Sequence, residues 1–244
     1  SMINSLSIVL PLFNEEERLP YLFNSIKKFS TSAKYDLEFI FVDDGSIDRS
    51  LFLVKNFKKK NIKIINIKII NYKNNKGKGY ALKQGVLSSN KKWILTIDID
   101  LSVSFEQFNY WVKNKYLKKD NNIFFGSRLL KKSKVIAKKS RVFTGNIFNV
   151  LLRLIISNKF LGIKDTQCGF KLYEKNLAKI IFKKMKEYGY IHDVEILILI
   201  RKNKFTVHEL PINWVHKDGS KINIIKDSIK MLIDLFRLKL RYKL

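Results

Sequence analysis

Two pairs of carboxylates, each at the end of an apolar run, are the residues of this sequence best suited to chemistry. Asp98 and Asp100 close the run at residues 93–97, and Asp43 and Asp44 close another. Such runs are typical of strands buried in a parallel sheet, where ligands bind at the carboxyl ends of the strands. Side chains two residues apart on an extended chain point the same way, and carboxylate oxygens suit Mg²⁺ or Mn²⁺ whose shell substrate phosphates complete. The pattern predicts a nucleotide and its metal at this edge.

A glycine-rich segment, Lys-Gly-Lys-Gly at residues 76–79, lies directly before an expected helix that extends to residue 88. Glycines there allow close approach of a ligand to the backbone, and the amino terminus of a helix favours anions. Leu82 stands where the third glycine of a dinucleotide fingerprint belongs, and no P-loop motif occurs. Hydride transfer and P-loop chemistry therefore lose support.

Three further residues are candidates for a site. Arg128 follows a strand-end glycine and could clamp a phosphate, although such arginines are often ordinary surface residues. Asp165 opens a polar stretch, residues 165–171, that is typical either of a site loop or of an ordinary turn. Asp193 begins a helix, as a cap or as a site acid. The histidines match no zinc motif, so zinc chemistry is not expected.

Strand and helix patterns alternate along most of the chain. This alternation predicts an α/β fold with a mostly parallel, Rossmann-like sheet and helices on both faces. Strands are expected at residues 6–10, 37–42, 62–70, 93–97, 123–125 and 206–210, and helices from about residue 14 and at 47–57, 78–88, 105–118, 146–156, 175–184 and 194–202.

Composition sets wider bounds. The 244 residues suit one large domain with a short appendage. A net charge of +27 suggests nucleic acid, an anionic membrane or phosphorylated substrates as partners, but Lys, Asn and Ile are abundant together, as an AT-rich genome would produce. Charge is therefore weak evidence. Cys168, the single cysteine, favours a reducing, cytosolic setting, and no apolar stretch reaches the roughly 18 residues of a membrane span.

The end of the chain is a basic amphipathic segment. We expect a catalytic domain at residues 1–215 and a C-terminal tail at residues 216–244. Apolar residues from Ile222 onward fall at helical spacing, whereas residues 236–244 alternate apolar with basic, as a strand would. Continuity with the preceding pattern favours an amphipathic helix. It would lie in a membrane interface or pack on the domain, and the sequence leaves both open.

Read together, six separated segments resemble the family 2 inverting glycosyltransferases, which have the GT-A fold. The similarity runs from about residue 6 to the end of the chain. Three blocks, HDVE at residues 192–195, ELPINW at 209–214 and the DTQCGFK segment, are similar to dolichyl-phosphate β-glucosyltransferases and their polyprenyl-phosphate relatives. The six segments are PLFNEE at 11–16, VDDGS at 42–46, NKGKGYAL at 75–82, DID at 98–100, GSR at 126–128 and DTQCGFK at 165–171.

The resemblance implies transfer of a hexose, most simply glucose, from a UDP-sugar to the phosphate of a polyprenyl or dolichyl carrier, with inversion at the anomeric carbon. It also implies roles for the donor-site residues. Asp98 and Asp100 would hold Mg²⁺ or Mn²⁺ at the diphosphate, and Lys221 would be a second cation. The residues expected to bind the nucleotide itself are Pro11, Asn14, Glu15, Asp43, Lys76 and Asp98.

For the acceptor, the same resemblance implies that Arg128 holds the charge of the acceptor phosphate or of the diphosphate. Asp165 is the first candidate for orienting or deprotonating the acceptor, and Asp193 the second. A general base is less necessary than for an alcohol, because a phosphate is already ionised near neutral pH. We expect the protein on the cytoplasmic face of a membrane, held peripherally by its tail.

Three other functions are compatible with parts of the sequence. One is a family 2 transferase that acts on a saccharide acceptor in polysaccharide or glycan synthesis. A second is a nucleic-acid-binding protein, but basic residues interleaved with aromatics and recognition motifs are not visible, so we expect no nucleic acid partner. The third is a non-catalytic adaptor at a membrane surface.

Overall fold

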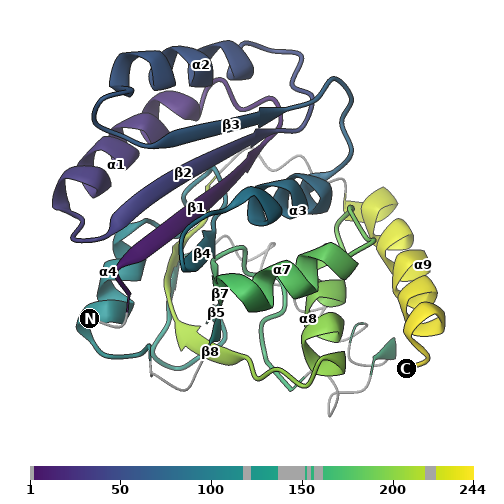
Figure 1. Ribbon diagram of the computed structural model, residues 1–244. Helices are drawn as coiled ribbons and strands as arrows, with labels where there is room; N and C mark the ends of the chain where they lie inside the picture. Colours follow the sequence, from purple (N-terminus) through teal and green to yellow (C-terminus); the bar gives the residue numbers. More distant parts are fainter. Residues whose placement is uncertain (1–2, 118–121, 137–151, 153–154, 157–161, 218–223) are drawn as a thin grey trace.

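A seven-stranded sheet forms the centre of the computed structural model, which describes residues 3–117, 122–136, 152, 155–156, 162–217 and 224–244 (Figure 1). The strand order across the sheet is β3-β2-β1-β4-β7-β5-β8. Its strands are β1 (Ser5–Leu12), β2 (Asp36–Asp43), β3 (Ile67–Asn71), β4 (Trp93–Thr96), β5 (Ile123–Ser127), β7 (Lys171–Glu174) and β8 (His208–Pro211).

The sheet is parallel except for β7, which pairs antiparallel with both β4 and β5. The expected mostly parallel α/β fold is therefore confirmed. β7 itself was not expected from the sequence, because it is only four residues long and begins with a fully buried lysine, Lys171. β3 starts at Ile67 rather than at residue 62, since the preceding residues form turns and leave Ile62 and Ile64 exposed.

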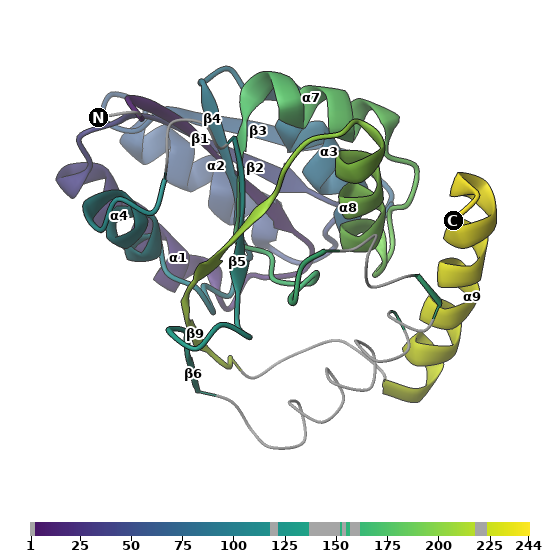
Figure 2. The same cartoon turned by 90° about the horizontal axis from the view of Figure 1, so that it is seen from below.

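Helices cover both faces of the sheet (Figures 1 and 2). One face packs against α1 (Leu19–Ser32), α2 (Ser50–Asn61) and α4 (Glu106–Lys113). The other packs against α3 (Lys78–Ser88), α7 (Lys175–Lys184) and α8 (His192–Lys202). In β1, for example, Ile8 and Leu10 face the first helical layer and Val9 faces the second. Because successive side chains of a strand point to opposite faces, one strand contributes to both hydrophobic cores.

The strand ends meet at one edge, which positions the candidate residues. Asp43 is the last residue of β2, and Thr96 of β4 pairs with Lys171, the first residue of the antiparallel β7. The segment that leads into β7 therefore lies at the same edge as the carboxyl ends of the parallel strands. A separate two-stranded sheet of β6 (Lys134–Ile136) and β9 (Asn213–Val215) follows β5 and β8 beyond this edge (Figure 2).

The C-terminal segment forms a helix, α9 (Ile224–Tyr242), as the apolar spacing predicted. Leu235 and Leu238 are buried against the second helical layer, while Ile233, Phe236 and Leu240 are exposed on the opposite side. Both sides of α9 therefore carry apolar residues. Among the described residues, no helix combines the length and apolarity needed to cross a bilayer. The proposed boundary at residue 216 stays a prediction, and most of the helix expected at residues 146–156 lies outside the described residues.

Close packing of α3 on the sheet gives a first test. A Cβ atom on Gly85 would lie 2.3 Å from Cγ1 of Val9 and 3.1 Å from Cγ2 of Val42. We expect Gly85→Ala to lower the free energy of unfolding by about 1–2 kcal/mol, because overpacking outweighs the gain of about 1 kcal/mol in helix propensity. Urea denaturation measures this change.

Gly189→Ala is the matched control, because no heavy atom lies within 4 Å of a Cβ at that position. Its free energy of unfolding should stay within about 0.5 kcal/mol of the wild-type value. Equal effects of the two substitutions would contradict the close approach of α3 to β1.

Candidate functional site

The turns after β1 and β2 are fastened to each other. Asn14, at φ 53°, donates its backbone N–H to Oγ of Ser46 at 2.9 Å and accepts from the backbone N–H of Ile47 at 2.9 Å. The backbone N–H of Glu15 donates to Oγ of Ser50 at 2.8 Å. Two of the predicted nucleotide-binding residues are thus held in fixed positions at the sheet edge.

Asp43 presents an unused acceptor at this place. Its carboxylate is buried; Oδ2 accepts from the backbone N–H of Ser46 at 3.3 Å, while Oδ1 has no hydrogen-bond partner. Burial raises the pKa of Asp43, against the opposing effect of the Ser46 hydrogen bonds. A buried acceptor without a donor is costly, so a ligand N–H or hydroxyl group would be favoured here. Pro11 lies on the neighbouring strand β1, paired with Val42, the residue before Asp43.

Asp44, the other half of the pair, faces the protein instead. Its carboxylate accepts from Nδ2 of Asn75 at 2.9 Å and from the backbone N–H groups of Lys76 and Gly77 at 2.8 and 2.9 Å. These bonds fix the turn before α3, which we call the glycine turn (residues 75–79), and Gly77 there has φ 100°. Asp44 therefore positions the backbone of the glycine turn. The sequence, in which Asp43 and Asp44 look alike, did not distinguish this role.

Lys78 is a site residue that the sequence analysis missed. Its Nζ lies 2.5 Å from Oδ1 of Asp98, with 43% of the Lys78 side chain and 39% of the Asp98 side chain exposed. Desolvation lowers the pKa of Lys78, but the charges of Asp98, Asp193 and Asp100 raise it more, and the net shift is upward. The sequence feature that could have identified Lys78 is its position between two glycines, at the first residue of a helix.

Lys76, which was expected to bind the nucleotide, lies near two tyrosine rings. Its Nζ is 4.6 Å from the centre of the Tyr80 ring and 5.7 Å from that of Tyr72. Lys221, the expected second cation, lies outside the described residues. Lys78 is consequently the cation of the glycine turn that the structure places against the carboxylates.

The residues around Asp98 fit a hard divalent cation. A Cβ on Gly169 would lie 2.5 Å from Oδ2 of Asp98, so only glycine leaves room for this carboxylate. Asp100 accepts at Oδ1 from the backbone N–H of Ser102 at 2.9 Å, which fixes its orientation. In the part of the chain that the structure describes, no three His, Cys, Asp or Glu side chains form a complete metal cage. One or two carboxylates plus phosphate oxygens are the usual ligands of Mg²⁺.

Arg128 and Asp165 form a bidentate ion pair beside this cluster. Oδ2 of Asp165 accepts from Nε of Arg128 at 2.7 Å and Oδ1 accepts from Nη2 at 2.9 Å. Glu209 of β8 holds the loop by accepting from the backbone N–H groups of Lys164 and Asp165 at 2.8 and 2.9 Å. The charge of Asp98 also acts on Arg128, so the pair belongs to the same electrostatic group.

The two predicted acidic groups have lowered pKa values. Burial raises the pKa of Asp165, but its hydrogen bonds and ion pair with Arg128 outweigh this and lower it overall. Asp193 is likewise lowered, because His192, Lys171 and Lys78 together outweigh its desolvation. Its Oδ1 pairs with Nζ of the buried Lys171, which also donates to the backbone oxygen of Thr166 at 3.1 Å. Both carboxylates are committed to neighbouring cations.

The loop before β7 also contains the single cysteine. Cys168 is buried as a free thiol, and Sγ would lie 3.2 Å from a Cβ on Gly126. Burial, together with the charge of Asp165, raises the pKa of this thiol to about 12. Cys168 is therefore a packed core residue and not a nucleophile.

The chain matches a family model described as glycosyl transferase family 2 over residues 7–182. It is similar to curated dolichyl-phosphate beta-glucosyltransferases: that of Dictyostelium discoideum is 38% identical, covering 98% of this chain and 75% of the relative. The enzyme of Saccharomyces cerevisiae is 34% identical with the same coverage of both chains, and that of Homo sapiens is 30% identical, covering 99% and 77%.

Solved structures show the same fold. Glucosyl-3-phosphoglycerate synthase from Mycobacterium tuberculosis, crystallised with Mn²⁺, UDP and glucosyl-3-phosphoglycerate, aligns with a TM-score of 0.69 at 17% identity, covering 98% of this chain and 80% of that one. Mannosyl-3-phosphoglycerate synthase from Rubrobacter xylanophilus aligns with a TM-score of 0.68 at 15% identity, covering 96% and 72%.

The Arg128–Asp165 pair predicts a specific pH dependence of stability. Asp165→Asn should lower the free energy of unfolding by about 2–3 kcal/mol at neutral pH, because it removes the charged partner of a mostly buried ion pair. A lowered carboxyl pKa stabilises the folded state above the ordinary value of 3.8 and loses this effect as the pH falls through the folded-state pKa. The difference between wild type and variant should therefore shrink below about pH 4.

Urea denaturation of both proteins between about pH 3 and pH 7 measures that difference. A gap that stayed constant over the whole range would contradict the assigned ionisation of Asp165.

Proposed function

Since this chain belongs to glycosyl transferase family 2, we propose that it transfers glucose from UDP-glucose to the phosphate of a dolichyl or polyprenyl carrier, with inversion at the anomeric carbon. Relatives named dolichyl-phosphate beta-glucosyltransferase, 30 to 38% identical over nearly the whole chain, support the substrates. The M. tuberculosis synthase crystallised with UDP-glucose and Mn²⁺ supports the donor and the cation.

The observation that carries this proposal is the group of opposite charges at the carboxyl edge of the sheet. Lys78 lies against Asp98, and the charges of Asp98 act on both Lys78 and Arg128. A reaction between a sugar diphosphate and a phosphate acceptor brings several negative charges into one site. Fixed cations and a metal there would stabilise the diphosphate as it departs, with little reorganisation during the reaction.

On the nucleoside side, the free Oδ1 of Asp43 would accept a hydrogen bond from the base or ribose. Asn14 and Glu15, fastened to the neighbouring turn, and Pro11 would form the walls of this pocket. Lys76, whose Nζ lies 4.6 Å from the centre of the Tyr80 ring, would close it. These five assignments follow the family motifs, and the geometry supports Asp43 most directly.

Asp98 and Asp100 would hold Mg²⁺ or Mn²⁺, which when bound supplies positive charge to the leaving diphosphate. Lys78 adds a protein cation at the same carboxylates, and its raised pKa keeps it charged near neutral pH. From its place against Asp98, Lys78 would also supply positive charge to the donor phosphates. The family resemblance also implies Lys221 as a second cation at the diphosphate, and that assignment stays a prediction.

Arg128 would bind the acceptor phosphate, oriented by its bidentate bonds to Asp165. Of the two roles predicted for Asp165, this geometry supports orientation, because a carboxylate with a lowered pKa and bonds to Arg128 is a weak base. Asp193, paired with Lys171, would act in the same way by positioning Lys171 and Lys78. An ionised phosphate needs no base in order to attack.

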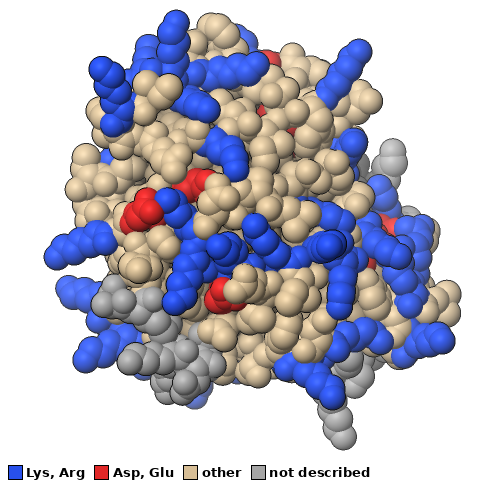
Figure 3. Space-filling model, viewed as in Figure 1, with Lys and Arg blue, Asp and Glu red and all other residues tan. Residues whose placement is uncertain are grey.

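A lipid carrier places the reaction at a membrane, and α9 offers a surface for it. Ile233, Phe236 and Leu240 are exposed on its outer side, with Arg237 and Lys239 between them. An apolar strip flanked by basic residues suits an anionic bilayer interface, and we place it on the cytoplasmic face. On the face of the molecule in Figure 3, lysines and arginines extend over several elements, and the expectation of no nucleic acid partner stays a prediction.

Transfer of labelled glucose tests the function directly. Incubated with UDP-glucose, Mg²⁺ and a short-chain polyprenyl phosphate, the protein should produce an acid-labile glucosyl phosphate lipid. Asp100→Ala should lower kcat/KM at least about a hundredfold, because it removes a ligand of the cation at the leaving group. Asp36→Ala is the control: this carboxylate is exposed at the amino end of β2, paired with Lys91 at 2.6 Å.

Glucose found on a saccharide acceptor and not on the lipid phosphate would decide for the alternative family 2 activity. Full turnover by Asp100→Ala would instead contradict the metal site.

The outer side of α9 gives a prediction of its own. Phe236→Ser should weaken binding to vesicles of phosphatidylglycerol and phosphatidylcholine by roughly tenfold to a hundredfold, because burial of this ring contributes about 1.5–3 kcal/mol. Ile64→Ser is the control, since Ile64 is 77% exposed in the loop between α2 and β3. Co-sedimentation measures both variants, and equal losses would show that the apolar side of α9 is not the contact.

A further inference from the structure

The loop between α7 and α8, residues 185–190, lies directly behind the glycine turn. The backbone N–H of Gly79 donates to the backbone oxygen of Tyr188 at 2.9 Å, and Nζ of Lys83 donates to that of Met185 at 2.7 Å. The rings of Tyr80 and Tyr188 meet edge to face with centroids 5.1 Å apart. One face of this loop is therefore bound along the first two turns of α3.

The loop and the glycine turn pack so closely that no side chain fits between them. A Cβ on Gly77 would lie 2.5 Å from the backbone oxygen of Tyr188, and one on Gly79 would lie 2.8 Å from that of Glu187. Because the two backbones are in contact, the position of the loop determines the position of the glycine turn. Lys78, which is directed at Asp98, lies between these two glycines.

The other side of the loop is held by a fully buried carboxylate. Glu195 of α8 accepts from the backbone N–H groups of Lys186 and Glu187 at 2.8 and 2.6 Å, both through Oε2. Its second oxygen, Oε1, accepts from the hydroxyl of Tyr242 at 2.6 Å. One carboxylate thus joins the loop to the last turn of α9.

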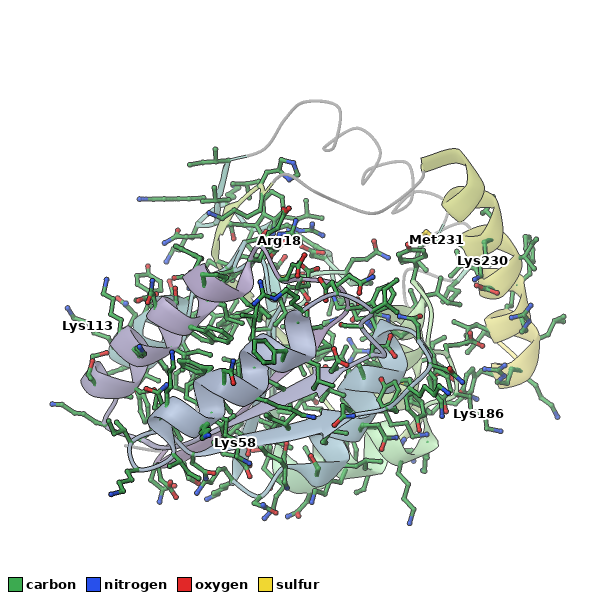
Figure 4. The ribbon with its side chains drawn as sticks, turned by 90° about the horizontal axis from the view of Figure 1, so that it is seen from above. Arg18, Lys58, Lys113, Lys186, Lys230 and Met231 are labelled. Carbon is green, nitrogen blue, oxygen red and sulfur yellow. The ribbon has the colours of Figure 1, made fainter. Side chains whose placement is uncertain are left out.

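A second bond runs beside the first. Nη1 of Arg241 lies 2.6 Å from Oε1 of Glu187, a residue of the loop itself. Figure 4 shows Lys186 near the C-terminal end of α9, and Lys230 and Met231 farther toward the start of the helix. The final turn of α9 therefore holds the loop.

We propose that Glu195, Tyr242 and Arg241 are positioning residues of the donor site, which act through loop 185–190 on the glycine turn and Lys78. The proposal rests on the proposed function in taking the donor as a UDP-sugar. None of the three touches the glycine turn in the bonds described above; each holds the loop against which the turn closes. Loss of a hydrogen-bond donor to the buried carboxylate of Glu195 would loosen that support.

Tyr242→Phe is the sharpest test, because it removes one hydroxyl group and keeps the ring. We expect the Kd of UDP with Mg²⁺, measured by calorimetry, and the KM for UDP-glucose to rise roughly fivefold. The kcat at saturating donor should change less than the KM does, since Arg128 and Asp165 are untouched. Arg241→Ala, which removes the second bond, should act in the same direction.

Arg237→Ala is the matched control on the same helix, because its guanidinium pairs with Asp234 at 2.9 Å, one turn earlier in α9. Its UDP affinity should equal that of the wild type. A purely structural role for Tyr242 would lower the melting temperature and leave the Kd and KM unchanged, and that result would overturn the proposal.

Amide hydrogen exchange makes the test independent of any ligand. The N–H of Gly79, bonded to Tyr188, should exchange several times faster in Tyr242→Phe than in wild type or Arg237→Ala. Unchanged exchange there would overturn the proposal even if the donor were a different nucleotide. Absence of glucosyl transfer by the wild type, with exchange altered in the variant, would reject the proposed function alone.

Discussion

The ion pair between Lys78 and Asp98 links the two parts of the chain that form the reactive edge. Lys78 starts the helix after β3, and Asp98 follows β4. Asp98, Asp100 and Asp193 all act on this one ammonium group, so it offsets the repulsion among carboxylates that would otherwise oppose their convergence.

Contacts from three sides hold the Lys78–Asp98 ion pair in place. Asp44 binds the glycine turn from the side of β2, and loop 185–190 supports it from behind. Across the site, Gly169 leaves space for the carboxylate of Asp98, and Thr96 bonds to the backbone oxygen of Gly169 at 3.0 Å. Contacts this close, to backbone at Gly77 and Gly79 and to the Asp98 carboxylate at Gly169, leave no room for a side chain, which explains glycine at these three positions.

The sequence predicted the architecture because buried strands and amphipathic helices leave periodic patterns, and the carboxyl ends of parallel strands meet at one edge. The family resemblance and the GT-A fold are confirmed. Besides Lys78, two features were not predicted from the sequence. The four residues of β7 are too short for a period and begin with Lys171, whose burial depends on Asp193, distant in sequence. The adjacent Asp43 and Asp44 look alike, and only the turn at residues 75–77 distinguishes their roles.

The environment of Cys168 has a practical consequence for probing this molecule. Its thiol is buried, and at neutral pH it stays protonated because its pKa lies near 12. Thiolate-directed reagents such as maleimides would therefore find no native target in the folded chain. A cysteine introduced at an exposed site, for example Leu240→Cys on α9, can carry a spin label or a fluorophore without removal of the natural one, so the depth of that helix in a bilayer is open to spectroscopy.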